Sequence, residues 1–141
     1  MNEIGVRAAA LLVADDKLLL VNHRKGGRSY WVLPGGHVRP GEPLPDALRR
    51  EMKEELDLDV TVGPLLIVHD FIRGERHVVN NVFRVETAST DVHVTPEKVL
   101  KDARWVPLDE LESVDLLPPI GAELRRIVSE PTVRTLYLGR R

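Results

Sequence analysis

The stretch from Gly36 to Leu58, GHVRPGEPLPDALRREMKEELDL, constrains this chain more than any other part of it. Pro45 suits the first position of a helix, where its missing N–H is not needed, and Asp46 follows in the first turn, where the helix dipole favours an anion. These signals predict a helix from about Pro45 to Leu56. The same stretch holds five carboxylates before the predicted helix end, on Glu42, Asp46, Glu51, Glu54 and Glu55, and a sixth on Asp57.

The predicted helix has one apolar face and one acidic face. At about 100° per residue, apolar side chains recur at i+4 spacing on Leu44, Leu48, Met52 and Leu56. Glu51, Glu54 and Glu55 share the adjoining arc, because they are three or four residues apart. Three like charges on one face destabilise a helix unless a cation lies among them, and oxygen donors are what Mg²⁺ and Mn²⁺ bind. The alternative is a solvated face with ordinary ion pairs, such as Arg50 with Glu54.

A glycine-containing loop precedes the helix. Gly35 and Gly36 are adjacent, and Gly41 comes directly before Glu42. Paired glycines let the backbone approach a ligand or adopt positive φ without steric cost. Alone, such a pair most often marks a turn. At a fixed spacing from Glu42 and the acidic helix, it favours a functional site instead.

Together these residues resemble the signature of the Nudix hydrolases: a glycine, five residues, a glutamate, seven residues, then Arg-Glu-apolar-any-Glu-Glu-any-Gly-apolar. The matching positions are Gly36, Glu42, Arg50, Glu51, Met52, Glu54, Glu55 and Leu58. Asp57 stands where the family has glycine. That glycine is similar to a helix C-terminal residue at positive φ, which Asp tolerates at a cost of about 1 kcal/mol. The segment from Trp105 to Leu111 also resembles the strand and turn that the family has near its C-terminal end.

The resemblance implies an α/β (α+β) fold, a Nudix-type α/β/α sandwich with a mixed β-sheet. At 141 residues, of which 43% are hydrophobic, the chain is expected to form a single domain over residues 1–141. Turns are expected at Asp15-Asp16 and at Arg73 to Glu75, and a second helix at Gly121 to Ser129. Strands are expected at Val6 to Ala14, Lys17 to Asn22, Tyr30 to Leu33, Val60 to Val62, Leu65 to Ile72, His77 to Glu86 and Ala103 to Val106.

The resemblance also implies a metal-dependent pyrophosphohydrolase that cleaves the diphosphate linkage of a nucleotide or nucleoside diphosphate derivative by attack of water on phosphorus. Its cofactor would be Mg²⁺ or Mn²⁺. The implied metal ligands are Glu51, Glu54, Glu55 and the carbonyl of Gly35, with Glu42 supporting them from outside. The alternative is a Nudix-fold module that binds or senses a nucleotide without turnover. Such modules typically lose signature acids, and this chain keeps all of them.

The sequence offers two locations for the general base, the predicted helix and a later loop. Within the helix the candidates are Glu54 and Glu51. A carboxylate beside a divalent cation has a lowered pKa, so a less tightly held acid can be the better base. Glu97 precedes the strand that contains Trp105, where the family often has an extra acid, although it can equally be a solvated loop residue. Arg50 is expected to orient the glutamates, because its planar fork pairs bidentately with carboxylates.

Substrate contacts are less constrained by the sequence. Two basic groups could meet phosphate or could simply be solvated: Arg24, Lys25 and Arg28 in an expected loop, and Arg73, Arg76 and His77 near a later turn. His37 follows Gly36 and is expected near the metal or the leaving group. Three aromatic residues could either stack on the base of a substrate or pack in the core: Tyr30, Trp31 and Phe71. Structural roles are expected for His23, His69 and His93.

Charge and composition limit the partners. A net charge of −2 without a long basic run argues against a nucleic-acid polymer and leaves a small-molecule nucleotide as substrate. The absence of cysteine excludes disulfides and thiolate metal sites. The longest apolar runs, such as Ala8 to Ala14, are too short to span a bilayer, and the first residues lack a basic leader, so a cytoplasmic protein without a membrane partner is expected. The resemblance also suggests a homodimer, since dimers are frequent among similar proteins.

Overall fold

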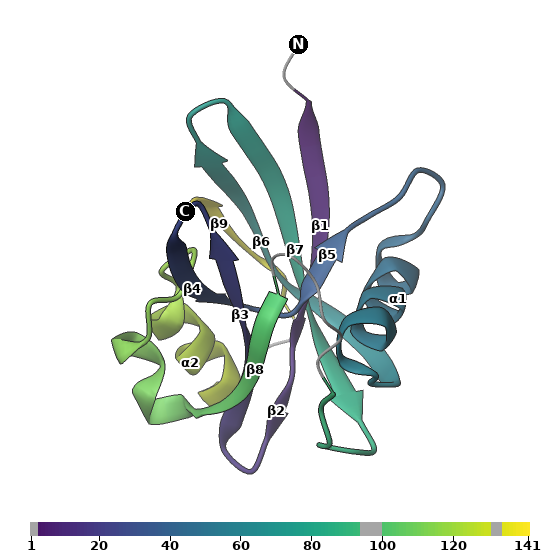
Figure 1. Cartoon of the computed structure of the whole chain (residues 1–141), viewed down its shortest axis with the longest axis vertical. Coiled ribbons are helices and arrows are strands. Elements are labelled where there is room, and N and C mark those ends of the chain that lie inside the picture. Colours follow the sequence, from purple (N-terminus) through teal and green to yellow (C-terminus); the bar gives the residue numbers. More distant parts are fainter. Residues whose placement is uncertain (1–2, 94–99, 131–133) are drawn as a thin grey trace.

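The computed structural model describes residues 3–93, 100–130 and 134–141 (Figure 1). The elements in chain order are β1 (Ile4–Leu11), β2 (Val13–Ala14), β3 (Lys17–Lys25), β4 (Arg28–Val32), β5 (Gly35–His37), α1 (Leu44–Leu56), β6 (Val60–Arg73), β7 (Arg76–Thr87), β8 (Leu100–Pro107), the 3₁₀ helix η1 (Leu108–Ser113), α2 (Gly121–Ser129) and β9 (Leu136–Arg140). The strands lie between α1 and α2 (Figure 1). The predicted α+β sandwich is confirmed.

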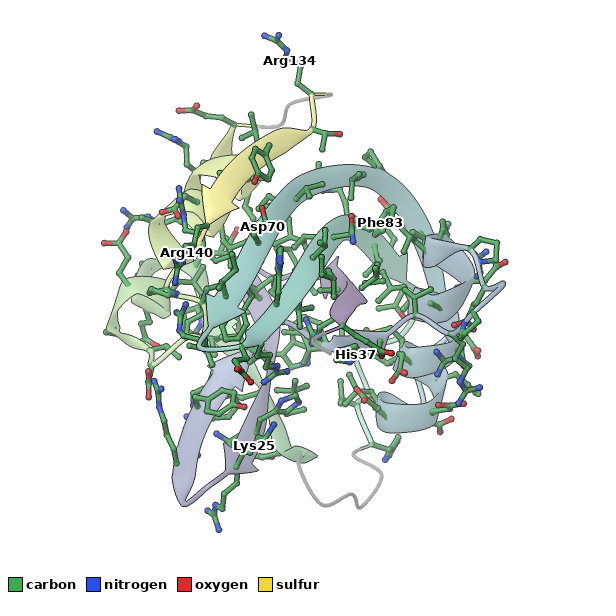
Figure 2. The ribbon with its side chains drawn as sticks, turned by 90° about the horizontal axis from the view of Figure 1, so that it is seen from above. Lys25, His37, Asp70, Phe83, Arg134 and Arg140 are labelled. Atoms are coloured by element: carbon green, nitrogen blue, oxygen red, sulfur yellow. The ribbon has the colours of Figure 1, made fainter. Side chains whose placement is uncertain are left out.

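The larger sheet is mixed, as predicted. Its strand order is β5-β1-β7-β6-β9, in which β1 runs parallel to β7 and β6 parallel to β9, whereas β5 and β1, and β7 and β6, are antiparallel. β6 and β7 form a long hairpin that curves strongly (Figure 2). Its turn follows Arg73, which pairs with Arg76, and Gly74 there has φ of 59°. The predicted turn at Arg73 to Glu75 is therefore confirmed.

A second, antiparallel sheet contains β2, β3, β4 and β8. Asp15 and Asp16 join β2 to β3 with φ of 52° and 58°, the positive values that a two-residue hairpin turn requires. The predicted hairpin is confirmed, but the single strand predicted from Val6 to Ala14 is wrong. The chain changes sheets at Leu12, because β1 pairs with β7 whereas β2 pairs with β3.

The expected basic loop after β3 is also a hairpin. Lys25 pairs with Arg28 across Gly26 and Gly27, whose φ values are 60° and 77°. The basic residues before and after these glycines therefore belong to strands β3 and β4. Figure 2 shows Lys25 near the tip of this hairpin. Successive side chains of a strand point to opposite faces, so Arg24 and Lys25 cannot both face the same site.

Helix α1 begins at Leu44, one residue earlier than predicted, so Pro45 is its second residue, where the N–H is still not needed. It ends as predicted, because Asp57 adopts the left-handed conformation with φ of 53°. The Asp57 N–H donates to the carbonyl of Lys53 at 3.1 Å, and the next N–H, of Leu58, donates to Met52 at 3.2 Å. These two bonds cap the last turn of the helix.

The two faces of β1 build two separate cores. Ala8 and Ala10 face α1, where they pack with its predicted apolar row, Leu48, Met52 and Leu56. Ala9 and Leu11 face the other way, toward Leu124 and Ile127 of α2. Because alternate strand residues share a face, Arg7 lies on the α2 side, at the point where that core ends. Over the described ranges, no helix has the length and apolar character that crossing a bilayer requires.

Candidate functional site

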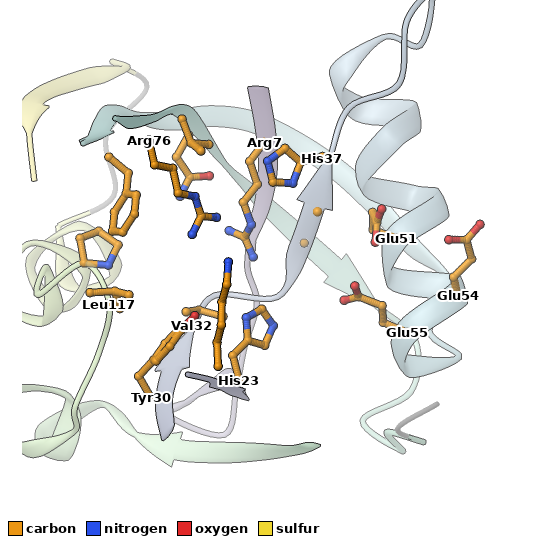
Figure 3. A pocket seen from close by; sticks show the side chains of 17 residues that line it. Arg7, His23, Tyr30, Val32, His37, Glu51, Glu54, Glu55, Arg76 and Leu117 are labelled. Atoms are coloured by element: carbon orange, nitrogen blue, oxygen red, sulfur yellow. The ribbon is translucent and has the colours of Figure 1, made fainter. Parts of the chain in front are cut away.

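A cleft of about 470 Å³ opens where α1, the two sheets and the segment after η1 meet (Figure 3). Its lining carries both charge signs. Carboxylates come from α1, cations come from β1, β3 and β7, and apolar walls come from β4, β6 and the segment before α2. Such a cleft suits a ligand that has anionic and apolar parts.

The acidic side of the cleft is formed by Glu51, Glu54 and Glu55, the three acids that the sequence places on one helix face. Figure 3 shows Glu51 and Glu55 on the side of α1 that faces β5, with Glu54 farther out. The backbone of Gly35 and Gly36 on β5 also lines the cleft. The predicted metal ligands therefore share one wall.

The two glycines are explained by close approaches of the chain. A Cβ on Gly36 would lie 2.3 Å from the carboxyl carbon of Glu51, so only glycine leaves this carboxylate its place. Gly35 has φ of 152°, and a Cβ there would lie 2.1 Å from the backbone oxygen of Ala8. Gly36 thus makes room for a site acid, whereas Gly35 is needed for the pairing of β5 with β1.

The donor set fits a hard divalent cation in kind, because three carboxylates and a backbone carbonyl offer only oxygen. In the described part of the chain, however, no three Asp, Glu or His side chains lie close enough together to hold an ion as they stand. Like charges keep the acids apart, and Glu51 is drawn to Arg50, with Nη1 donating to Oε1 at 2.8 Å. Side-chain rotation on α1 would be needed for the three to share one ion.

Arg50 connects the loop after β5 to the acids of α1. Its Nε donates to Oε2 of Glu42 at 2.8 Å and its Nη2 to Oε1 at 2.9 Å, a two-point ion pair. Nη1 also reaches Oε2 of Glu54 at 3.2 Å, and Nη2 reaches the carbonyl of His37 at 3.2 Å. The hydrogen bonds from Arg50 lower the pKa of the Glu42 carboxyl to about 2. Neither Glu42 nor Arg50 lines the cleft, which is the geometry that a supporting role requires.

The cationic side of the cleft consists of Arg7, Lys25 and Arg76. Arg7 donates from Nη2 to the carbonyl of Leu33 at 2.7 Å, which fixes its guanidinium. Burial lowers the pKa of Arg7, and the nearby carboxylates of Glu55 and Glu51 oppose that shift. Figure 3 shows Arg7 and Arg76 facing these acids across the cleft. Arg7 is not among the predicted site residues, although a lone basic residue within an apolar strand was a usable signal.

The predicted substrate-contact residues divide into two groups. Arg76 and His37 line the cleft, and burial is the largest cause that lowers the pKa of His37. Within the described residues, the cleft lining does not include Arg24, Arg28 or Arg73.

The residues outside the cleft have other contacts or another orientation. Arg28 pairs with Asp115 at 3.3 Å on the surface. Arg73 lies over the ring of Phe71 at 4.7 Å and donates to the carbonyl of Arg141 at 3.0 Å. Of the predicted basic group Arg24, Lys25 and Arg28, Lys25 lines the cleft and Arg24 does not, because the two alternate in direction along β3. Glu97 lies outside the described residues.

Tyr30 and Phe71 line the cleft, together with Leu117 and Pro118. Trp31 instead packs against the α2-side core, with the guanidinium of Arg104 5.1 Å from its ring centre. These positions retain two of the three predicted stacking candidates.

His23, expected to be structural, also lines the cleft, and its ring meets that of Tyr30 edge to face at 6.0 Å between centres. Burial and the charge of Arg7 lower the pKa of His23 to about 4. This histidine is therefore neutral at pH 7.

Comparison with known proteins gives a consistent result. A family model described as the NUDIX domain matches residues 3–130. The nucleoside diphosphate-linked moiety X motif 6 of Mus musculus is 26% identical over 131 residues, which cover 90% of this chain and 42% of that protein. The NAD-capped RNA hydrolase NudC of Shigella flexneri is 31% identical over 126 residues, which cover 87% of this chain and 47% of that protein.

The chain thus spans less than half the length of these two relatives. The crystal structure of the MutT protein from Methanosarcina mazei Go1 matches with a TM-score of 0.79 at 23% identity, over 92% of this chain and 96% of that one. This similarity shows a shared fold.

Proposed function

This chain belongs to the Nudix hydrolase family, and from that membership we propose that it is a metal-dependent pyrophosphohydrolase. It would cleave the diphosphate linkage of a nucleotide or of a nucleoside diphosphate derivative. The observation that carries the proposal is the presence of Glu51, Glu54 and Glu55 in one cleft with Arg7 and Arg76. Carboxylates alone repel a diphosphate, so its binding requires a cation at the acids and positive charge opposite them.

Four oxygen donors would hold Mg²⁺ or Mn²⁺: the carboxylates of Glu51, Glu54 and Glu55, and the carbonyl of Gly35. When bound, such an ion neutralises phosphoryl oxygens and makes a bound water more acidic. Arg50 keeps the acids oriented, because its guanidinium contacts Glu51 and Glu54 while Glu42 holds it from the other side. Loss of that arginine would remove the hydrogen bonds that orient the Glu51 and Glu54 carboxylates.

The substrate's phosphate oxygens would be bound by the basic wall of the cleft. Arg7 is partly buried and held by the carbonyl of Leu33, so its charge is less screened than that of a surface arginine. Arg76 and Lys25 complete this wall. His37 lies between the basic wall and α1 (Figure 3), where its ring can approach the leaving group.

Within α1, the geometry favours Glu54 over Glu51 as general base. The side chain of Glu54 is 50% exposed, and its two ion pairs are long, 3.2 Å to Arg50 and 4.0 Å to Arg39. Glu51 is 14% exposed and has a shorter contact with Arg50, 2.8 Å. Water therefore has easier access to a lone pair of Glu54. Glu97 stays the alternative from the later loop.

The proposal retains a small-molecule nucleotide substrate, a cytoplasmic setting and a homodimer as expectations from the sequence and the family. A test is release of phosphate or nucleotide from a substrate panel, with and without Mg²⁺ or Mn²⁺. The panel would contain nucleoside triphosphates, ADP-ribose, sugar nucleotides, dinucleoside polyphosphates and an NAD-capped RNA, the last because the relative NudC is named for it. We expect metal-dependent turnover of at least one compound. Binding without any turnover would instead favour the sensing module.

A further inference from the structure

A row of three polar residues crosses the larger sheet at the floor of the cleft. Arg7 of β1 pairs in register with Asn80 of β7, and Asn80 pairs in register with His69 of β6. The next row along the same face is Ala9, Val82 and Ile67, all apolar and fully buried. The sheet face therefore changes from core to polar site within one row.

His69 and Asn80 are themselves deeply buried, with exposed fractions of 0% and 6%. Nδ2 of Asn80 lies 3.1 Å from Nε2 of His69, so the two side chains hydrogen-bond to each other. Each keeps one buried polar atom that has no hydrogen-bond partner among the described residues: Nδ1 of His69 and Oδ1 of Asn80. Unpaired buried polar atoms are rare in folded proteins, so we expect these two to hydrogen-bond to a water molecule or a ligand.

One unpaired donor and one unpaired acceptor remain whichever way the Asn80 amide is oriented. If Asn80 donates to Nε2, then His69 carries its proton on Nδ1, which leaves an N–H donor and the Oδ1 acceptor. If the amide is reversed, Nε2–H donates to Asn80, which leaves the NH₂ donor and an Nδ1 acceptor. Either arrangement offers one donor and one acceptor.

Both residues border the space that a ligand can reach. Asn80 lines the main cleft, and with His69 it also lines a small cavity that has room for about one water molecule. The cleft and the small cavity share Arg7, Leu117 and Pro118 in addition to Asn80. Because both open atoms are buried, they would meet a ligand through that water.

The pair carries no charge at neutral pH. Burial, and then the positive charge of Arg7, lower the pKa of His69 to about 4. A phosphate would be attracted to Arg7 but would meet an acceptor in either arrangement, Oδ1 of Asn80 or Nδ1 of His69. A neutral ring whose edge carries both a donor and an acceptor matches this site better, and Phe71, Leu117 and Pro118 give it apolar walls.

We propose that Asn80, held in place by His69, is the residue that selects the nucleobase of the substrate. This inference rests on the proposed function. A site with buried hydrogen-bonding groups rejects a ligand that leaves them unpaired far more strongly than an apolar pocket rejects a misfit. The preference between bases should therefore depend on the Asn80 amide.

The test measures the affinity of four α,β-methylene nucleoside triphosphates, with adenine, guanine, cytosine or uracil, by calorimetry in the presence of Mg²⁺. For the wild type we expect the Kd values of the best and worst base to differ by about tenfold or more. In Asn80→Ala this ratio should fall to about threefold or less. Asn80→Asp, which preserves the shape of the side chain, should change the order of the bases.

Asn81→Ala is the matched control. Asn81 is the next residue, is buried to a similar degree at 7% exposed, and points to the opposite face of β7. Its Nδ2 already donates to the carbonyls of Arg7 and Val79, at 3.2 and 3.3 Å. This control should lose stability without a change in the base ratio. His69→Phe should lower the ratio of Kd values as Asn80→Ala does, although the phenyl ring fills a similar volume to the imidazole.

Four outcomes would overturn the assignment: equal affinity for all four bases in the wild type, an unchanged ratio in folded Asn80→Ala, an equal fall in the Asn81→Ala control, or no binding of any analogue. Failure of the proposed function gives a different pattern. If base preference depends on Asn80 but no diphosphate compound is hydrolysed, base selection stands and the enzyme proposal fails. If a diphosphate is hydrolysed but the base ratio is unchanged in Asn80→Ala, the enzyme proposal stands and base selection by Asn80 fails.

Discussion

Arg50 and Glu42 form a two-point ion pair, Nε to Oε2 at 2.8 Å and Nη2 to Oε1 at 2.9 Å, which ties the loop after β5 to helix α1. The same guanidinium reaches Glu51 and Glu54 on the helix. One side chain therefore sets the distance between the glycine loop and the acidic face. The spacing of the signature motif has a physical meaning here, since it brings these four residues together.

Arg50→Lys is expected to lower kcat/KM by about 10- to 100-fold, because an ammonium cannot pair with Glu42 at two points and also hold two helix acids. The apparent affinity for Mg²⁺ should fall with it, which a rate titration against the metal measures. Arg49→Lys is the control, since Arg49 is exposed, pairs with Asp46 and lies outside the cleft. Equal effects of the two substitutions would contradict the positioning role.

Glu55→Gln is expected to leave the fold intact and to lower kcat at least about 100-fold, because an amide oxygen is a weaker ligand for a hard cation than a carboxylate. Glu112→Gln serves as the control, since Glu112 is exposed and pairs with Arg125 away from the cleft. Circular dichroism would verify the fold of both variants. A near-normal rate for Glu55→Gln would show that the acidic cluster is wrongly assigned.

Gly36→Ala and Gly35→Ala should fail for different reasons. A Cβ at Gly36 meets the flexible carboxylate of Glu51, which can move, so activity should fall while stability changes little. A Cβ at Gly35 meets the backbone of Ala8, which cannot move, so unfolding should become easier by at least about 2 kcal/mol. Urea unfolding and activity measured on both variants separate the cases. A stable, active Gly36→Ala would contradict the close approach of Glu51.

Asp57→Gly should stabilise the protein by about 0.5–1 kcal/mol, because glycine adopts φ of 53° without the strain that Asp57 bears. The surface pair of Asp57 with Lys53, 3.1 Å long, contributes less than this. Asp59→Gly removes the other carboxylate near Lys53, but Asp59 has no positive φ and should gain nothing. Thermal unfolding of the two variants tests this difference, and equal shifts in Tm would contradict it.

Stability should fall as the pH drops below 6.5, partly because of His69. Its pKa is about 4 in the folded protein and 6.5 as the ordinary value, so the unfolded chain binds the proton more tightly. The contribution is fully present above pH 6.5 and declines by about 2 kcal/mol from pH 7 to pH 5. His69→Gln should therefore show a smaller loss than the wild type in urea unfolding at these two pH values. Parallel losses would contradict a neutral buried His69.

The acidic side of the site was predictable from sequence, because helical periodicity and fixed spacing are local properties. The prediction that Glu51, Glu54 and Glu55 share one face required only the periodicity of one helix. The prediction for Asp57 required only the rules for a helix end. The row of polar residues at the floor of the cleft was not predictable in the same way. Arg7, Asn80 and His69 meet because β1, β7 and β6 pair in one register, and no local pattern specifies that pairing. Arg24 and Lys25 could not be told apart from sequence for the same reason, since the hairpin decides which of them faces the cleft.

Metal-dependent hydrolysis in the cleft between α1 and Arg7 can be tested by the initial rate of hydrolysis of the best compound in the substrate panel, measured against Mg²⁺ concentration after removal of metal with EDTA. We predict a rate at background without metal, a saturable rise with added Mg²⁺, and a weaker response to the metal in Glu55→Gln. A rate that is the same with and without divalent metal, or no turnover of any diphosphate compound at saturating Mg²⁺, would contradict it.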